Sequence, residues 1–122
     1  MGLALVVSLA AALGAGGRYT FDIVIQRWHS SGLPWGTFVI NMTGSLALGL
    51  VTGLALHHGL GDHTAIVLGT GLLGGYTTWS TFSWETFALA EQGRMSAAAA
   101  NAFGGLAIGL LAAAAGLGLA LL

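Results

Sequence analysis

The sequence predicts an all-α membrane protein with four transmembrane helices in a single domain, residues 1–122. Three observations support this prediction. The chain is 56% hydrophobic and only 6% charged, whereas soluble domains carry about 25% charged residues. Four apolar runs of about 20 residues occur, and a helix of that length crosses the hydrocarbon core of a bilayer. The 21 glycines suit helices that pack closely in lipid.

The four spans are expected at residues 3–25, 37–56, 64–90 and 97–122. Leu3 to Leu13 also resembles the apolar part of a signal peptide. No Lys or Arg precedes it, so we assign it to the first span. The only Pro, Pro34, stands in the loop at residues 30–34, just ahead of a helix, where its fixed φ is tolerated.

Small and polar residues recur every fourth position within these spans. The members of this pattern are Ala10, Gly14, Arg18 and Asp22 in the first span, Asn41, Ser45, Gly49 and Gly53 in the second, and Asn101, Gly105 and Gly109 in the fourth. Helix packing accounts for the glycines but not for Asn41, because an intramembrane polar group is costly unless it is paired or functional. Arg18 and Asp22 are four residues apart on one face and are expected to satisfy each other.

The third span is interrupted by polar residues. Six of the ten residues from Thr77 to Thr86 carry hydroxyls, and the pair Gly74 and Gly75 precedes them. This pattern predicts a polar path and a break near Gly74 to Thr78, because irregular backbone is tolerated in a membrane only where it is buried or lines a cavity. Unwound carbonyls at a break can hold a small cation, while the N-terminus of the next half-helix faces an anion.

The residue types along this path favour an anion. Hydroxyls, the Asn41 amide and aromatic edges offer hydrogen-bond donors and positive ring rims. A cation filter needs rings of carboxylates or stacked carbonyls, and Glu85 is the only carboxylate in the middle of this segment. A cation path therefore stays open as the weaker alternative.

Composition excludes several function classes. The net charge of −1 and the lack of basic clusters argue against a nucleic-acid partner. No nucleophile with a nearby base and no carboxylate pair is placed for chemistry, so we expect no enzyme. Without Cys, thiolate sites are absent. A loop holds His57, His58, Asp62 and His63. We interpret it as solvated, with a metal site as the alternative.

Three motifs resemble the CrcB/Fluc family of fluoride channels. They are Gly16-Gly17-Arg18-Tyr19, Asn41-Met42-Thr43-Gly44-Ser45 and Gly74-Gly75-Tyr76-Thr77-Thr78-Trp79-Ser80-Thr81-Phe82-Ser83-Trp84-Glu85. The resemblance spans the whole chain in segment number, motif order and loop length. It implies an antiparallel, dual-topology homodimer with two fluoride pores, multi-pass in the lipid of the cell inner (plasma) membrane. Such a channel passively lets fluoride leave the cell.

The resemblance also implies roles for individual residues. Pore positions of the family fall on Asn41, Trp79, Phe82, Ser80 and Thr81. The backbone carbonyls that hold a structural, untransported Na⁺ at the dimer centre fall on Gly74 and Thr77. Structural or vestibule positions fall on Arg18, Asn101 and Glu85.

Two positions depart from the family pattern. Trp79 stands where relatives usually have Phe, and Gly105 stands where they commonly have Ser, so a pore hydroxyl is missing. Either Asn101 and the Trp79 N–H compensate, or conduction is altered, or a different second subunit completes the pore. A non-conducting or partner-dependent subunit of a heteromeric channel is therefore one alternative function.

A small multidrug exporter with four helices is the other alternative. That class needs a membrane-embedded carboxylate early in the chain, to exchange protons for a cationic drug. Asp22 is the only acidic residue before the second loop, and it stands near the end of the first span beside Arg18. The exporter is therefore the weaker alternative.

Overall fold

The computed structural model describes residues 2–28 and 32–122, and every regular element in these ranges is helical. The elements are α1 (Gly2–Trp28), α2 (Trp35–His57), α3 (Asp62–Ile66), η1 (Val67–Leu73), α4 (Gly74–Tyr76), α5 (Trp79–Glu91), α6 (Met95–Ala99), η2 (Ala100–Gly104) and α7 (Gly105–Leu119). The segments η1 and η2 are π-helical turns. The prediction of an all-α chain is confirmed, and residues 29–31 of the first predicted loop lie outside the described residues.

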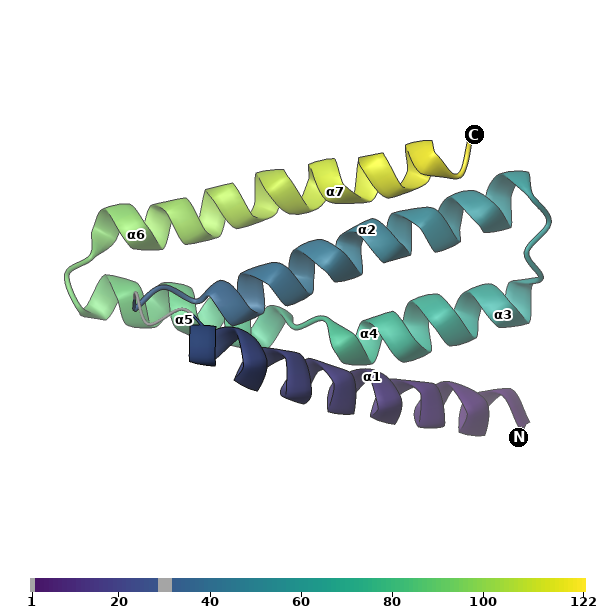
Figure 1. Cartoon of the computed structure of the whole chain (residues 1–122), viewed down its shortest axis with the longest axis horizontal. Coiled ribbons are helices and arrows are strands. Elements are labelled where there is room, and N and C mark those ends of the chain that lie inside the picture. The colour runs from purple at the N-terminus through teal and green to yellow at the C-terminus, as the bar shows by residue number, and fades with distance from the viewer. Residues whose placement is uncertain (1, 29–31) are drawn as a thin grey trace.

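The helices run side by side in an elongated bundle (Figure 1). α7 packs along α2, and α1 packs along η1 and α4. At one end of the bundle α1 begins, α7 ends, and α2 connects to α3. We call the opposite end, where α5 turns into α6, the arginine end, because Arg27 lies in the last turn of α1 and Arg94 precedes α6 there.

Three helical stretches are long and apolar enough to cross a membrane, judged by length and composition. They are Gly2–Arg27, Trp35–His57 and Met95–Leu119. They correspond to the first, second and fourth predicted spans. The segment predicted at residues 64–90 is helical from residue 62 to 91 but is divided at Thr77 and Thr78, so neither part has the length of a full span.

The helices approach each other through glycines. A Cβ added to Gly14 in α1 would overlap the Leu72 carbonyl of η1. Likewise, a Cβ added to Gly116 in α7 would overlap the Leu46 carbonyl of α2. Backbones in direct contact are typical of helix pairs in lipid, where close packing replaces the hydrophobic effect as the driving force.

Large apolar side chains point away from the bundle. Ile40 is only 1% exposed, but Leu13 is 72%, Leu110 64% and Leu111 69% exposed. In water such a surface would favour aggregation, whereas lipid tails solvate it at no cost. The burial pattern is therefore inverted relative to a soluble protein, as a membrane location requires.

Candidate ion pathway

The break between α4 and α5 consists of two residues with extended backbone. Thr77 has a ψ of 164°, and Thr78 has a φ of −147° and a ψ of 122°. The Thr77 N–H and hydroxyl both donate to the Leu73 carbonyl at 2.9 Å, which completes the last turn of α4. The break thus lies at the end of the stretch in which the sequence predicts it.

Hydroxyl groups cap the start of α5. The Thr78 Oγ1 accepts a hydrogen bond from the Thr81 N–H at 3.2 Å and donates to the Thr81 Oγ1 at 2.9 Å. The Ser80 Oγ lies 3.4 Å from the same Thr78 oxygen. This arrangement satisfies a backbone donor at the helix N-terminus, where the partial positive charge of the helix dipole is concentrated.

The Asn41 side chain in α2 forms hydrogen bonds with the backbone of the break. Its Nδ2 donates to the Thr78 carbonyl, and its Oδ1 accepts from the Thr78 N–H, both at 2.9 Å. In a continuous helix that N–H would bond to the Gly74 carbonyl. The Asn41 amide therefore replaces the hydrogen bonds that the unwound residue loses. The interrupted helix then leaves neither backbone group of Thr78 unpaired inside the bundle.

An open cavity of about 360 Å³ lies beside the break, and we call it the central cavity. Its polar lining residues are Asn41, Ser45, Thr77 and Thr78. Its aromatic lining residues are Phe38, Trp79 and Phe82, and Gly74 and Gly105 also line it. None of the described residues that line it is a carboxylate. Ser80 and Thr81, which the resemblance assigns to the pore, lie outside this lining.

Two aromatic rings stand next to each other in the wall of the central cavity. The ring centroids of Trp79 and Phe82 are 5.4 Å apart, and their planes are tilted by 40°. Trp79 is 74% exposed. The ring edge of Phe82 faces the backbone of Gly105 at the start of α7.

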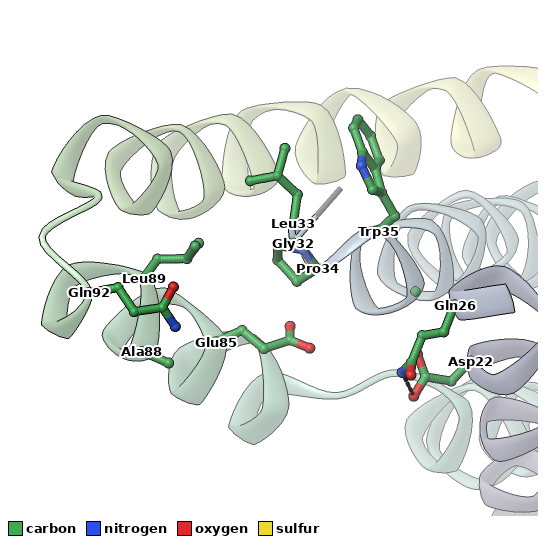
Figure 2. Close-up of a pocket in the computed structure, with 11 residues that line it drawn as sticks. Asp22, Gln26, Gly32, Leu33, Pro34, Trp35, Glu85, Ala88, Leu89 and Gln92 are labelled. Atoms are coloured by element: carbon green, nitrogen blue, oxygen red, sulfur yellow. Dashed lines mark hydrogen bonds between the residues drawn. The ribbon is translucent and has the colours of Figure 1, made fainter. Parts of the chain in front are cut away.

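A second open cavity, of about 380 Å³, lies at the arginine end, and we call it the carboxylate cavity. Asp22 from α1 and Glu85 from α5 lie along its wall, together with Gln26 (Figure 2). The Glu85 Oε1 accepts a hydrogen bond from the Thr37 hydroxyl at 2.8 Å. The other oxygen, Oε2, is buried and has no hydrogen-bond partner among the described residues.

The expected pairing of Arg18 with Asp22 is wrong. The Asp22 Oδ2 instead accepts a hydrogen bond from the Gln26 Nε2 at 2.8 Å (Figure 2). Asp22 also lies directly against Gly36 in the first turn of α2, where the helix dipole favours a negative charge. Arg18 is half-buried and forms no ion pair within the described ranges.

Asn101 lies outside both cavities. Its Nδ2 donates to the Thr86 hydroxyl at 2.8 Å, and that hydroxyl donates to the Phe82 carbonyl at 2.9 Å. Asn101 belongs to the π-helical turn η2. It therefore ties the start of the last helical segment to α5.

A line of polar side chains on α2 leads from Glu85 to the central cavity. Thr37, Asn41 and Ser45 stand one helical turn apart on the same face. Thr37 is 4% exposed and bonds to Glu85 of the carboxylate cavity, while the other two line the central cavity. Sequence analysis missed Thr37, although extending the four-residue spacing of Asn41 and Ser45 by one step finds it.

The histidine-containing loop has a structural contact. A ring nitrogen of His58 donates to the Ala120 carbonyl at the end of the chain. Throughout the part of the chain that the structure describes, no group of three or more His, Cys, Asp or Glu residues is placed to hold a metal ion. This hydrogen bond thus links the C-terminal end of α2 to the end of the last helical segment.

Comparison with known proteins finds a consistent set of relatives. A relative from Streptomyces avermitilis is 50% identical over 112 residues, which cover 92% of this chain and 90% of the relative. One from Nitrobacter winogradskyi is 43% identical over 93% of this chain and 90% of its own length. One from Thermus thermophilus is 40% identical over 89% of this chain and 87% of its own length. All three are named fluoride-specific ion channels.

A family model agrees with these relatives. The model described as "CrcB-like protein, Camphor Resistance (CrcB)" matches residues 5–117. Both results cover most of the sequence, and the long apolar helices fit a multi-pass protein of the plasma membrane. The chain therefore belongs to the CrcB family, whose members are ion channels and not enzymes.

Proposed function

We propose that this chain is a subunit of a passive, fluoride-selective channel. The observation that supports it best is the polar line of Thr37, Asn41 and Ser45, which leads from Glu85 to the central cavity beside the break. The absence of a carboxylate from the described lining of the central cavity supports an anion rather than a cation. The names of the relatives supply the identity of that anion.

The hydrogen-bond donors that line the central cavity support fluoride as the transported ion. Asn41 uses one of its two amide hydrogens on the Thr78 carbonyl and keeps the other for an ion. The N-terminus of α5 adds partial positive charge, and aromatic edges add positive rims. A small, strongly hydrated anion needs many donors to replace its water, so a path of this kind favours fluoride over larger halides.

Fluoride leaves the cell in this proposal without an energy source. Hydrogen fluoride crosses the bilayer and dissociates inside, which traps the anion. The negative-inside membrane potential then drives fluoride outward, with about 2.3 kcal/mol per elementary charge for each 100 mV. An open selective pore is sufficient, and neither ATP nor a coupled ion is required.

The third segment crosses the membrane in this proposal as two half-helices, α3 to α4 and then α5. Discontinuous helices of this kind place their free backbone groups at an ion site near the middle of the membrane. The single chain then crosses four times. This topology places the N- and C-terminal ends on the same side of the membrane.

The residues at the break fit a sodium ion. Gly74 and Thr77 both line the central cavity, and the C-terminal end of α4 bears the negative end of a helix dipole. Because the Thr78 N–H donates to Asn41, the Gly74 carbonyl lacks its helical donor. These two carbonyls would hold Na⁺, which supplies a fixed positive charge at the break and is not transported.

A second copy of the chain in the opposite orientation completes the pore in this proposal. The central cavity is open, and its lining includes the exposed side chains of Trp79, Leu106 and Leu110. Without a partner, the open side of an ion path would face lipid. A homodimer is favoured because a single chain supplies both the polar line and the aromatic pair, and a different partner subunit is the alternative.

Fluoride efflux from liposomes that contain only this protein tests the proposal. With a potassium ionophore to remove the membrane voltage, an ion-selective electrode should record release of fluoride and no release of chloride. Equal release of both halides would remove the claim of selectivity. Release of neither would favour a non-conducting or partner-dependent subunit.

A further inference from the structure

Gly105 differs from its neighbours in what a side chain would meet. A Cβ added there would lie 2.8 Å from Cε2 and 3.4 Å from Cζ of the Phe82 ring. A Cβ added to the preceding residue, Gly104, would have no heavy atom within 4 Å. Gly105 is buried, whereas Gly104 is partly exposed. The ring of Phe82 thus occupies the place of a side chain at position 105.

The Phe82 ring that faces Gly105 also contacts the indole of Trp79. The two ring centroids are 5.4 Å apart, and all three residues line the central cavity. To reach an ordinary contact of about 3.5 Å with a new Cβ, the ring would have to retreat by more than about half an ångström. That retreat changes the contact of the ring with the indole or its position in the cavity wall.

We propose that Gly105 is a positioning residue, which fixes the Phe82 ring against Trp79 because it has no side chain. The proposal rests on the proposed function for its effect on ion passage. According to the proposal, position 105 must have no side chain. A hydroxyl added there does not supply a missing ion contact but disturbs the aromatic pair. The missing side chain at Gly105 and the large indole of Trp79 then act together to place the Phe82 ring.

Fluoride efflux from three variants tests this requirement. Gly105→Ala and Gly105→Ser should each lower the rate by about tenfold, because both add the Cβ that displaces the ring. Gly104→Ala is the matched control on the adjacent residue, and it should keep the rate of the parent protein. If Gly105→Ser conducts as well as the parent or better, the role of Gly105 in ion passage is overturned and position 105 simply lacks a useful hydroxyl.

A thermal-unfolding cycle tests the ring contact without any measurement of flux. Gly105→Ala should lower the unfolding midpoint of the purified protein by about 3 °C. In a Phe82→Leu background, where the distal ring atoms are absent, the same change should have little effect. Equal losses in both backgrounds would show that Gly105 and Phe82 are not coupled, which overturns the proposal.

The two experiments separate failure of this proposal from failure of the proposed function. A parent protein that passes no fluoride contradicts the proposed function and the role of Gly105 in passage, while the thermal cycle still decides whether Gly105 positions the ring. Coupling in the thermal cycle together with unchanged flux in the Gly105 variants would overturn the role in passage alone. Coupling in the thermal cycle together with loss of flux in the Gly105 variants supports both the positioning of the ring and its role in ion passage.

Discussion

Asn41 combines two tasks in one side chain. Its amide forms the same pair of hydrogen bonds to Thr78 that a neighbouring strand would form with an extended residue. One amide hydrogen is left over, and the residue lines the central cavity. The group that keeps the broken backbone satisfied is therefore also the group best placed to meet an anion.

Replacing Asn41 by Asp should stop fluoride conduction. The change is nearly isosteric, but it places a negative charge in the cavity and turns a donor to the Thr78 carbonyl into an acceptor. Repulsion between unit charges about 4 Å apart is about 4 kcal/mol near a protein surface, which corresponds to a loss of about a thousandfold in rate. Liposome efflux measures the loss, and size-exclusion chromatography measures assembly.

A control on the same helix separates this effect from a general effect of polar substitutions in α2. Thr52 is exposed, and its hydroxyl bonds only to the Leu48 carbonyl of its own helix. Thr52→Ala should therefore retain both flux and assembly. If the Asn41→Asp protein assembles and still passes fluoride at the parent rate, Asn41 does not lie on the ion path.

At the scale of the elements, the position of the break depends on how closely α4 approaches α1. A Cβ added to Gly75 would overlap the Ala11 carbonyl, so the two backbones are in direct contact there. The contact fixes α4 next to α1, while Asn41 of α2 fixes the unwound residue that follows. The break is thus held from two neighbouring helices.

Gly75→Val should therefore destabilise the fold far more than the same change at a glycine with free space. We expect a loss of about 2 kcal/mol or more, because a branched side chain would force α4 away from α1. Gly16→Val is the matched control, since a Cβ there would have no neighbour within 4 Å. Thermal unfolding in detergent measures both, and equal midpoints would contradict the packing described here.

The sequence predicts the break well because its signals are local. The glycine pair and the run of hydroxyls stand within a few residues of Thr77 and Thr78, where the helix stops. The three long apolar helices are also predictable from apolar length alone, to within about three residues at each end. Local composition and length are properties that a single sequence carries.

The side-chain partners of individual residues were less predictable than the break. The spacing of Asp22 from Arg18 equals its spacing from Gln26, so spacing alone could not choose the partner that the structure shows. Asn41 forms hydrogen bonds with Thr78, which is 37 positions away in the sequence, and no local sequence pattern indicates that pair. The π-helical turn η2 likewise has no sequence signature, although it carries Asn101 toward Thr86.

The whole molecule carries its positive charge at one end. Arg27 and Arg94 lie at the arginine end, with Arg18 in the same half of α1, whereas no Lys or Arg is present toward the other end. Basic residues keep loops in the cytoplasm, and the bias here amounts to only two or three arginines. Such a small bias is compatible with insertion in both orientations, which an antiparallel homodimer needs.

Reporters fused after Leu122 should therefore be found on both sides of the membrane, with an excess outside the cell. Paired reporters, one active only in the cytoplasm and one only outside, measure the two populations. Adding Lys residues to the α2–α3 loop is the control, because it should shift the distribution toward the cytoplasm. If every reporter is found on one side, the antiparallel homodimer fails and an oppositely oriented partner subunit becomes the better account.

The exposed indole of Trp79 beside Phe82 has an optical consequence. With the other three tryptophans replaced by Phe, all indole emission would come from the wall of the central cavity. Iodide and bromide quench excited indole on contact, whereas fluoride does not. The emission of this single tryptophan would thus report which halides reach the aromatic pair, separately from which halides cross the membrane.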